Sequence, residues 1–594
     1  MSKSIRIGGA SGFWGDSTGS TPQLLKAGVD YLVYDYLAEI TMSIMARARA
    51  KDPAQGYAAD FVSAVLRPNL AQIAESGTKI LSNAGGVNPV ACGEAVRALV
   101  KAQGLDLIVA VITGDDLMDR ASGLADRAPR EMFTSAAFPE RDTIASINAY
   151  IGAFPVAAAL DAGADIVITG RCVDSAVTLG ACIHAFDWNA DDFDRLAAGS
   201  LAGHLIECGP QATGGNFTDW HLVKDSLATI GYPIATIAAD GGMTISKPEG
   251  TGGMVSIGTV AEQMLYEIGD PQAYILPDVI CDFSGVTFKE IGDDTVAVTG
   301  VQGRAPTDSY KVCATYLDGY RGTMVMSFVG LNAAEQAQVF AEAAFERAET
   351  RLRASNADDY TEKSIEILGA ESQYGAEARV GQVREVALKV ACRHPSAEGV
   401  GLLFRELSGM ALATPPGVSG FGAGRPRPTP MVRLFSFLLP KEEVALNLEI
   451  DGERRQRPPA AVFTPQAAPA VDAPEPAKPE TEMVDVPLVK LAWGRSGDKG
   501  DKANIGIIAR RPEYLPHIWR ALGNDAVAKR FAHFLEGDVE RFHLPGCHAI
   551  NFVLDNVLGG GGVASLRADP QGKGYAQILL SATIPVPAKL ANNL

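Results

Sequence analysis

The chain has 594 residues, of which 47% are hydrophobic and 21% charged, so it can form large buried cores and is not disordered as a whole. Its 70 acidic residues outnumber the 52 basic ones, which gives a net charge of −18. Such a surface repels phosphate backbones and anionic lipids, so we expect no nucleic acid or membrane partner. The eight cysteines include no C-x-x-C pair, and no signal peptide or long apolar run is present. These features predict a soluble, reduced, cytoplasmic protein.

The first 200 residues alternate short apolar runs with helical patterns. The runs cover residues 5–7, 31–34, 79–81, 107–112 and 165–168, and the helical patterns cover residues 37–50, 89–103 and 144–162. This alternation predicts a doubly wound α/β domain over residues 1–209, with a mostly parallel sheet and right-handed crossovers. In such sheets ligands bind at the carboxyl ends of the strands, where the following loops meet.

A second, α+β domain is predicted over residues 210–456. It would hold a β-hairpin around the Asp318-Gly319 turn, with strands 310–317 and 321–329, then a helix over 333–353 and strands over 363–368, 431–439 and 444–450.

Residues 457–480 hold seven prolines and seven alanines, which predicts an extended linker over residues 457–484. The linker would tether a small α/β module over residues 485–594. In that module we expect strands 489–492, 505–509, 551–554 and 576–581 and helices 516–522 and 525–534.

Glycine-rich loops follow the predicted strands. The loop GGASGFWGDS offers Ser11 and Gly12, and its backbone amides could bind an anion, although a tight turn without a ligand is an equal alternative. In the loop SNAGGVNP, the asparagines supply polar side chains and the glycines allow a ligand to approach the backbone closely. The residues are Asn83, Gly85, Gly86 and Asn88. Neither G-x-G-x-x-G nor a Walker motif is present, which disfavours a dinucleotide enzyme and an ATPase.

The loop TGRCVDSA places Arg171 and Asp174 directly after a strand. A guanidinium in that position suits a carboxylate or a phosphate, and the alternative is an internal Arg–Asp pair.

The segment HLIECGPQATGGNF holds Glu207 and Cys208 before a glycine loop that contains Gly214 and Gly215. A general base or a nucleophile is one interpretation, and a buried thiol beside a capping carboxylate is the other.

The segment KPEGTGGMVS combines Lys247 with Gly252 and Gly253. It predicts an oxyanion or phosphate cradle, or else a crossover loop that needs positive φ at its glycines.

The C-terminal module begins with WGRSGDKGDKANIG, which alternates in charge and contains Arg495 and Lys499. We expect a mobile loop at a strand end that contributes to substrate binding, with a solvated charged face as the alternative. The histidines at 543 and 548 lack a matching carboxylate pattern, so no metal is expected.

Taken in order, GGASGFWGDS, YLAEITMSI, NAGGVNP, ITGRCVDSA, ECGPQATGGNF, KPEGTGGMVS, DPQAYILPDV and TPPGVSGFGAGRPRPTP resemble the acyclic terpene utilization family, known after its AtuA member. RSGDKGDKANIGIIAR and NFVLDNVLGGGG resemble that family's ferredoxin-like C-terminal module. The resemblance implies a role in the catabolism of citronellol, geraniol and similar branched acids through CoA thioesters. It implies no particular catalytic residues.

The leading hypothesis is a catabolic enzyme that acts on a branched acyl-CoA or carboxylic acid by lyase or hydratase chemistry, as a homo-oligomer and without a cofactor of its own. Glu207 would be the base, with Cys208 and Asp174 as further catalytic candidates. Arg171 and Lys247 would hold the carboxylate or the phosphates of coenzyme A, and glycine amides would stabilise a developing enolate. The alternative is a non-catalytic subunit that binds acyl-CoA or organises a catabolic complex.

Overall fold

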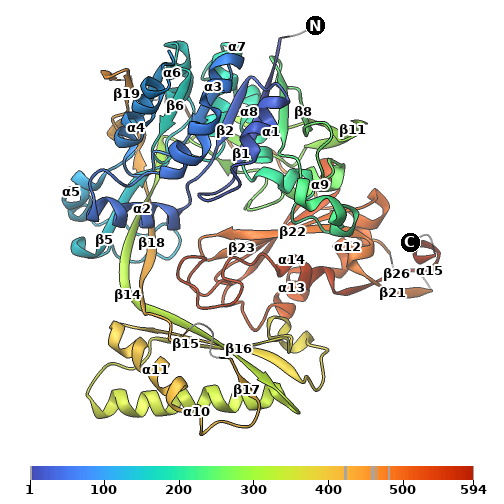
Figure 1. The fold of residues 1–594 in the computed structure, drawn as a ribbon. Coiled ribbons are helices and arrows are strands. Elements are labelled where there is room, and N and C mark those ends of the chain that lie inside the picture. The colour runs from blue at the N-terminus through green and yellow to red at the C-terminus, as the bar shows by residue number, and fades with distance from the viewer. Residues whose placement is uncertain are drawn as a thin grey trace.

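A computed structural model describes residues 3–420, 424–456, 461, 463–464, 466–478 and 482–592. It shows a mixed α/β chain with three main sheets (Figure 1). One lies in the large body, one packs on helices α10 (Ala333–Ala354) and α11 (Ala397–Gly409), and one lies in the C-terminal module.

The centre of the 11-stranded body sheet is parallel, in the order β1-β2-β3-β6-β4. These strands are β1 (Ser4–Ser11), β2 (Tyr31–Tyr34), β3 (Lys79–Ser82), β4 (Val109–Thr113) and β6 (Ile166–Thr169). Each overlaps one of the five predicted apolar runs, so the predicted parallel strands are confirmed. Their near-continuous apolar character fits a sheet that is buried on both faces.

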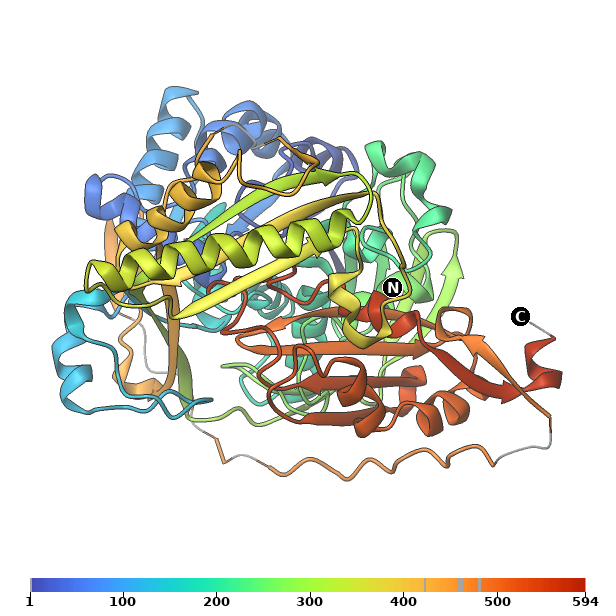
Figure 2. The same ribbon diagram turned by 90° about the horizontal axis from the view of Figure 1, so that it is seen from below.

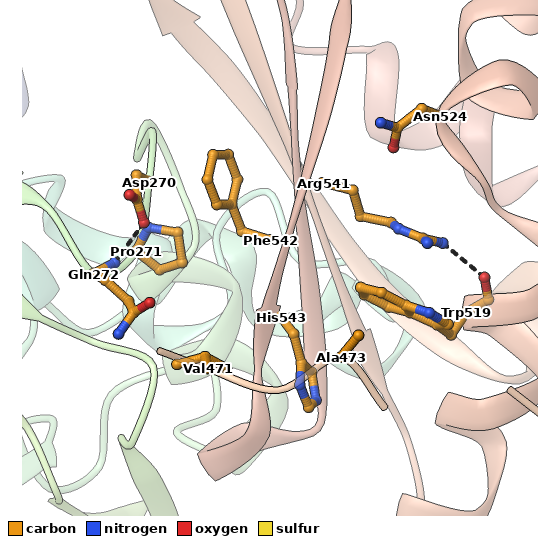
Figure 3. A pocket seen from close by; sticks show the side chains of 10 residues that line it. All are labelled: Asp270, Pro271, Gln272, Val471, Ala473, Trp519, Asn524, Arg541, Phe542 and His543. Carbon is orange, nitrogen blue, oxygen red and sulfur yellow. Dashed lines mark hydrogen bonds between the residues drawn. The ribbon is translucent and has the colours of Figure 1, made fainter. Parts of the chain in front are cut away.

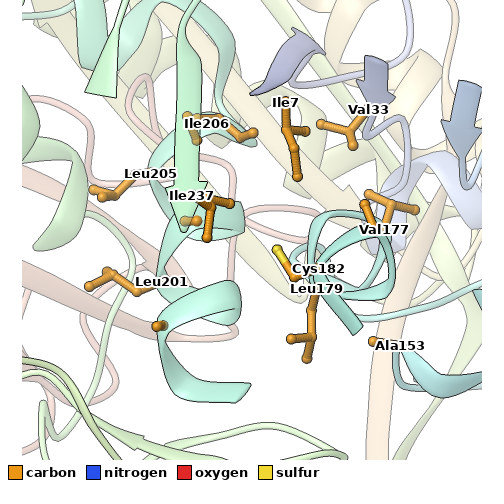
Figure 4. Close-up of a cluster of buried hydrophobic side chains, with 14 of the residues drawn as sticks. Ile7, Val33, Ala153, Val177, Leu179, Cys182, Leu201, Leu205, Ile206 and Ile237 are labelled. Atoms are coloured by element: carbon orange, nitrogen blue, oxygen red, sulfur yellow. The ribbon is translucent and has the colours of Figure 1, made fainter. Parts of the chain in front are cut away.

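Helices cover both faces of this parallel centre. One face packs on helices α1, α3 and α4, and the other packs on α6, α7 and α8, where Ile7, Val33 and Leu201 contribute to the core (Figure 4). The doubly wound layout stays a prediction. The helices are α1 (Ser20–Lys26), α3 (Arg67–Ser76), α4 (Pro89–Ala102), α6 (Phe154–Asp161), α7 (Ala176–Phe186) and α8 (Phe193–Ile206).

The sheet as a whole is mixed rather than mostly parallel. Antiparallel strands extend it on both sides, because the chain after residue 233 uses hairpins instead of helical crossovers. They are β7 (Ile234–Ala238), β8 (Met243–Ser246), β11 (Thr287–Gly292) and β12 (Thr295–Thr299) beside β1, and β19 (Asn447–Ile450) and β20 (Glu453–Gln456) beside β4. Strands from both sides of residue 209 thus share one sheet, and the division into domains stays a prediction.

The predicted helix over residues 144–162 is wrong in its first half. Residues Ile144–Ala149 form β5, which pairs with the long strand β14, so pairing overrides the helical pattern. Helix α6 begins only at Phe154, with Pro155 in its first turn. The other two predicted helices are present as α2 (Glu39–Lys51) and α4.

The predicted hairpin around Asp318-Gly319 is also wrong. Residues Ser309–Val329 form one strand, β14, in which Asp318 and Gly319 oppose the single residue Met431 of β18. Gly319 has φ +74°, so the positive φ expected of a hairpin turn is used for a β-bulge instead.

The second sheet packs on the helices α10 and α11. The long helix predicted over 333–353 and the strands predicted over 363–368 and 431–439 are present. The elements are β15 (Glu362–Leu368), β16 (Glu385–His394), β17 (Val418–Ser419), β18 (Thr429–Pro440), α10 (Ala333–Ala354) and α11 (Ala397–Gly409).

The C-terminal module has an antiparallel sheet in the order β22-β23-β25-β24. Both predicted helices and two of the four predicted strands are present. Residues Leu488–Lys490 form a 3₁₀ turn instead of a strand, and Tyr575–Leu580 form helix α14, packed against β22. The elements are β22 (Ala492–Lys499), β23 (Lys502–Ala509), β24 (Val539–Leu544), β25 (Ala549–Leu554), α12 (Leu515–Ala521) and α13 (Asn524–Arg530), with β21 (Met483–Pro487) paired to β26 (Thr583–Pro587).

The module is packed firmly against the body rather than loosely tethered. Asp219 accepts two hydrogen bonds from Arg510 at 2.6 and 2.7 Å, and Ile508 and Ala549 belong to the hydrophobic core of the body. The described linker residues 466–478 contain no helix or strand and run along the outside of the molecule (Figure 2). The remaining elements are α5 (Ala121–Asp126), α9 (Ile257–Met264), α15 (Ala588–Ala591), β9 (Tyr274–Ile275), β10 (Ile280–Asp282) and β13 (Gln302–Arg304).

Candidate active site

The ends of the parallel strands meet around Asp35, which follows β2. Ser11 Oγ, at the end of β1, donates to the Asp35 carbonyl at 3.1 Å, and Asn83 Nδ2, after β3, donates to its carboxylate at 2.5 Å. Burial raises the pKa of the Asp35 carboxyl, Asp174 raises it further, and Arg171 offsets part of the rise. The sheet edge therefore gathers polar groups from three loops around one buried acid.

Arg171 is buried in the loop after β6. Its NH1 donates to Asp174 at 2.9 Å, so the internal Arg–Asp pair is present, and its guanidinium lies 4.1 Å from the ring centre of Tyr150. The Tyr150 hydroxyl donates to Glu39 at 2.5 Å. Arg171 Nε is buried without a hydrogen-bond partner among the described residues. An uncompensated buried donor of this kind is unusual and is typical of a site that takes a ligand or water.

The charges around Tyr150 come from two different sheets. Lys311, on β14, lies 3.6 Å from Glu39 and 4.8 Å from the ring centre of Tyr150. Burial alone would raise the pKa of Glu39, but Lys311 and Arg171 outweigh it and lower the pKa to about 2. Glu39 is therefore ionised at neutral pH.

Glu207 and His204 share a single proton. His204 Nε2 lies 3.0 Å from the Met264 carbonyl, which can only accept, so this nitrogen carries a hydrogen. His204 Nδ1 lies 3.1 Å from Glu207 Oε1, which requires a proton on either the acid or the imidazole. Burial raises the pKa of Glu207, and His204 offsets part of that rise. Glu207 Oε2 is buried and has no partner in the described part of the chain.

The C-terminal module contributes a cation to this cluster. Lys499, at the end of β22, lies 3.1 Å from Glu267, which Lys573 also contacts at 2.8 Å. Burial alone would lower the pKa of Lys499, but the carboxylates of Glu267, Asp174 and Glu207 outweigh it and raise the pKa. The segment that we expected to be a mobile loop is thus a strand of the β22–β23 hairpin, held against the body.

Cys208 has the wrong electrostatic surroundings for a nucleophile. Burial raises the pKa of its thiol, and the carboxylates of Glu207 and Glu267 raise it further. A reactive cysteine needs a lowered pKa, because the thiolate is the nucleophile. Of the two interpretations, the one without a nucleophilic role is better supported, and the Cys208 side chain itself is half-buried.

The glycine amides that were expected to bind substrate are already engaged within the protein. Gly12 N donates to the Asp16 carboxylate at 2.9 Å, and Gly85 N donates to the Thr169 carbonyl at 3.1 Å. Those of Gly86, Gly214, Gly215, Gly252 and Gly253 also donate to oxygens of the chain. Close approach explains two of these glycines, since a Cβ at Gly12 would lie 2.9 Å from the Cys208 Cα and one at Gly85 would lie 2.5 Å from Thr169 O.

Three further predicted residues are committed to structural contacts. Asn88 caps helix α4 and donates to two carbonyls at 2.8 and 2.9 Å. Lys247 is paired with Asp294 at 2.9 Å and donates to the Thr251 carbonyl, as expected of a closed crossover loop. Arg495 lies over the ring of Tyr266 and donates to the Asn216 carbonyl.

Sequence reasoning grouped His204 with Glu207 and Cys208, but it missed Asp35, Glu39, Tyr150 and Lys311 as members of the site. Among the described residues, no group of three or more His, Cys, Asp or Glu side chains is placed to hold a metal ion. No helix in the described ranges is long and apolar enough to cross a membrane.

The fold and the acidic strand-end cluster define an α/β body joined to a compact C-terminal module. The sequence profile described as "Acyclic terpene utilisation family protein AtuA" matches residues 5–450, and the "AtuA ferredoxin-like domain" matches residues 486–585. The chain therefore belongs to the acyclic terpene utilisation family and carries that family's ferredoxin-like module. Neither the curated proteins nor the solved structures contain a match.

Proposed function

We propose that the protein is a cytoplasmic enzyme of acyclic terpene or branched-acid degradation, acting on a carboxylic acid or its CoA thioester by lyase or hydratase chemistry. The observation that carries this proposal is the buried cluster at the strand ends, where Glu207 Oε2 and Arg171 Nε lack partners among the described residues. Eight free thiols fit a reducing compartment.

The cluster offers an acid and a base in one place. Burial raises the pKa values of the Asp35 and Glu207 carboxyls above their ordinary range, and raised pKa values are typical of groups that transfer protons in catalysis. In a hydration, Glu207 would take a proton from water as the water oxygen bonds to the β-carbon, and Asp35 would give a proton to the α-carbon. The reverse steps would eliminate water, so the same pair serves either direction.

Side chains, rather than glycine amides, would stabilise the developing enolate. The predicted amides already donate within the protein, whereas Arg171 and Lys499 both bring positive charge to the Asp174 carboxylate. Arg171 is buried, and a cation shielded from water stabilises a growing negative charge more than it would in bulk water, whereas the exposed Lys499 would contribute less.

The test is to incubate the purified chain with citronellyl-, geranyl- and methylcrotonyl-CoA and with the free acids, and to follow product masses. Turnover that is lost in Glu207→Gln supports the proposal. Stoichiometric binding without any turnover would instead identify the chain as an acyl-CoA-binding subunit.

A further inference from the structure

A cavity separate from the strand-end site lies where three segments of the chain meet (Figure 3). Its volume is 330 Å³, and it is lined by residues 270–272 of the body, by Val471 and Ala473 of the linker, and by the C-terminal module around Trp519 and β24. None of the candidate site residues lines it. The volume corresponds to roughly eleven water molecules at ~30 Å³ each, which is enough for a small organic molecule.

One wall presents a fixed guanidinium without an acidic partner. Arg541 lies 3.5 Å from the ring centre of Trp519, and its NH1 donates to the carbonyls of Trp519 and Leu522 at 2.7 and 2.9 Å. Burial lowers the pKa of Arg541, and no carboxylate among the described residues pairs with it. Its Nε and NH2 make no hydrogen bond within that part of the chain, so they remain able to bind an anion.

The same face of β24 presents an acceptor beside this cation. His543 is two residues from Arg541 and therefore shares its side of the strand, whereas Phe542 points the other way (Figure 3). His543 Nδ1 lies 2.8 Å from the Asp472 carbonyl of the linker, so this nitrogen carries the hydrogen. Nε2 is buried without a partner among the described residues, and burial lowers the pKa of the ring, which keeps Nε2 an acceptor.

The body supplies a second acceptor and an apolar wall. Asp270 accepts from the Gln272 amide at 2.8 Å with one carboxylate oxygen. Pro271 and Val471 add hydrocarbon surface. The cavity thus combines one cation, hydrogen-bond acceptors and apolar walls.

We propose that this cavity binds a small carboxylate that also carries a hydrogen-bond donor on its α-carbon, as an α-hydroxy acid or an α-amino acid does. The carboxylate would lie against Arg541, and the hydroxyl or ammonium group would donate to His543 or Asp270. Side chains two residues apart on one strand face lie about 7 Å apart, which leaves room for both groups side by side. Val471 and Ala473 of the linker line the cavity, so the bound molecule would also contact the linker and hold it to the module.

Three compounds with one carbon skeleton test the recognition directly. Leucine and 2-hydroxy-4-methylpentanoate carry the donor, and 4-methylpentanoate lacks it. In isothermal titrations of the full chain, we expect the first two to bind at one site and at least about tenfold more tightly than the third, because the third leaves buried acceptors unpaired. Equal binding of all three, or binding of none, would overturn the proposal.

Variants locate the binding. Ala473→Trp should fill the cavity from the linker and abolish binding, whereas Ala468→Trp, at an exposed linker alanine that does not line the cavity, should leave it unchanged. Arg541→Met should weaken binding at least about tenfold if the guanidinium holds the carboxylate. Glu207→Gln should have no effect, which separates this site from the proposed active site. Binding that survives both Ala473→Trp and Arg541→Met would place the ligand elsewhere and refute the inference.

Discussion

Replacing Glu207 by glutamine tests the proposed base without removing its structural contact. Because His204 Nε2 carries a hydrogen, Nδ1 can accept from the glutamine amide just as it accepts from a protonated Glu207. The shape and the 3.1 Å contact are kept, but the side chain can no longer take a proton. If Glu207 is the base, kcat should fall by ~10²–10⁴, the usual contribution of a positioned acid or base.

The same variant should change the pH dependence of stability in a defined direction. Burial raises the folded-state pKa of Glu207. The contribution of protonated Glu207 to the free energy of unfolding is therefore complete below the ordinary pKa of a glutamate and is lost as the pH rises through the folded-state pKa. Near pH 4 the wild type and Glu207→Gln should have unfolding free energies within about 1 kcal/mol, because both side chains are neutral. Towards neutral pH, the variant should become the more stable of the two.

Urea unfolding at several pH values, together with turnover assays on the same preparations, measures both effects. Full activity in a stably folded Glu207→Gln would remove Glu207 from the mechanism. A stability loss of several kcal/mol at pH 4 would contradict the shared-proton geometry, since the amide would then fail to replace the acid as a donor to His204.

Other substitutions and a cleavage test the packing. Burial raises the pKa of Asp115 to about 7, so the wild type should lose stability, at most on the order of 4 kcal/mol, as the pH rises from about 4 to 7. The variant Asp115→Asn cannot ionise at this position and should not show this loss in urea titrations. Gly12→Ala should cost ~1–3 kcal/mol by calorimetry because its Cβ would meet the backbone of Cys208, while Gly123→Ala, with open space, should cost nothing. Cleavage at a protease site inserted after Ala467 should leave both pieces co-eluting on size exclusion, and separate elution would show that the interface is weak.

The periodic parts of the fold could be predicted from the sequence, and the parts set by distant pairing could not. The five parallel strands are buried on both faces, so each strand is a run of apolar residues that can be recognised in the sequence without knowing its neighbours. The Asp318-Gly319 pair predicts a turn locally, yet the pairing of β14 with β18 makes it a bulge. Likewise, residues 576–581 are apolar enough for a strand but pack as a helix against β22.

The residues of the candidate site could likewise be predicted from the sequence only in part. Glu207 and Arg171 stood out because glycine loops surround them in the sequence. Asp35 and Tyr150 are isolated polar residues at the ends of β2 and β5, and only the folded sheet brings them beside Arg171. The glycine loops suggested amides that are free to bind a substrate, but these amides donate to oxygens of the chain itself. The Asp16 carboxylate, for example, accepts a hydrogen bond from Gly12 N.

The three cations of the cluster come from three different parts of the chain. Arg171 lies in the loop after strand β6, Lys311 in the long strand β14, and Lys499 in the C-terminal module. Each faces carboxylates of the body that are partly or fully buried, so removing a cation leaves negative charge that solvent compensates only in part. A truncated body that lacks the module would therefore hold Glu207 without the charge of Lys499, and Glu267 without the charges of Lys499 and Lys573. The acidic site and the packing of the module are consequently one electrostatic unit, so loss of the module should disturb the site even though most of the acids lie in the body.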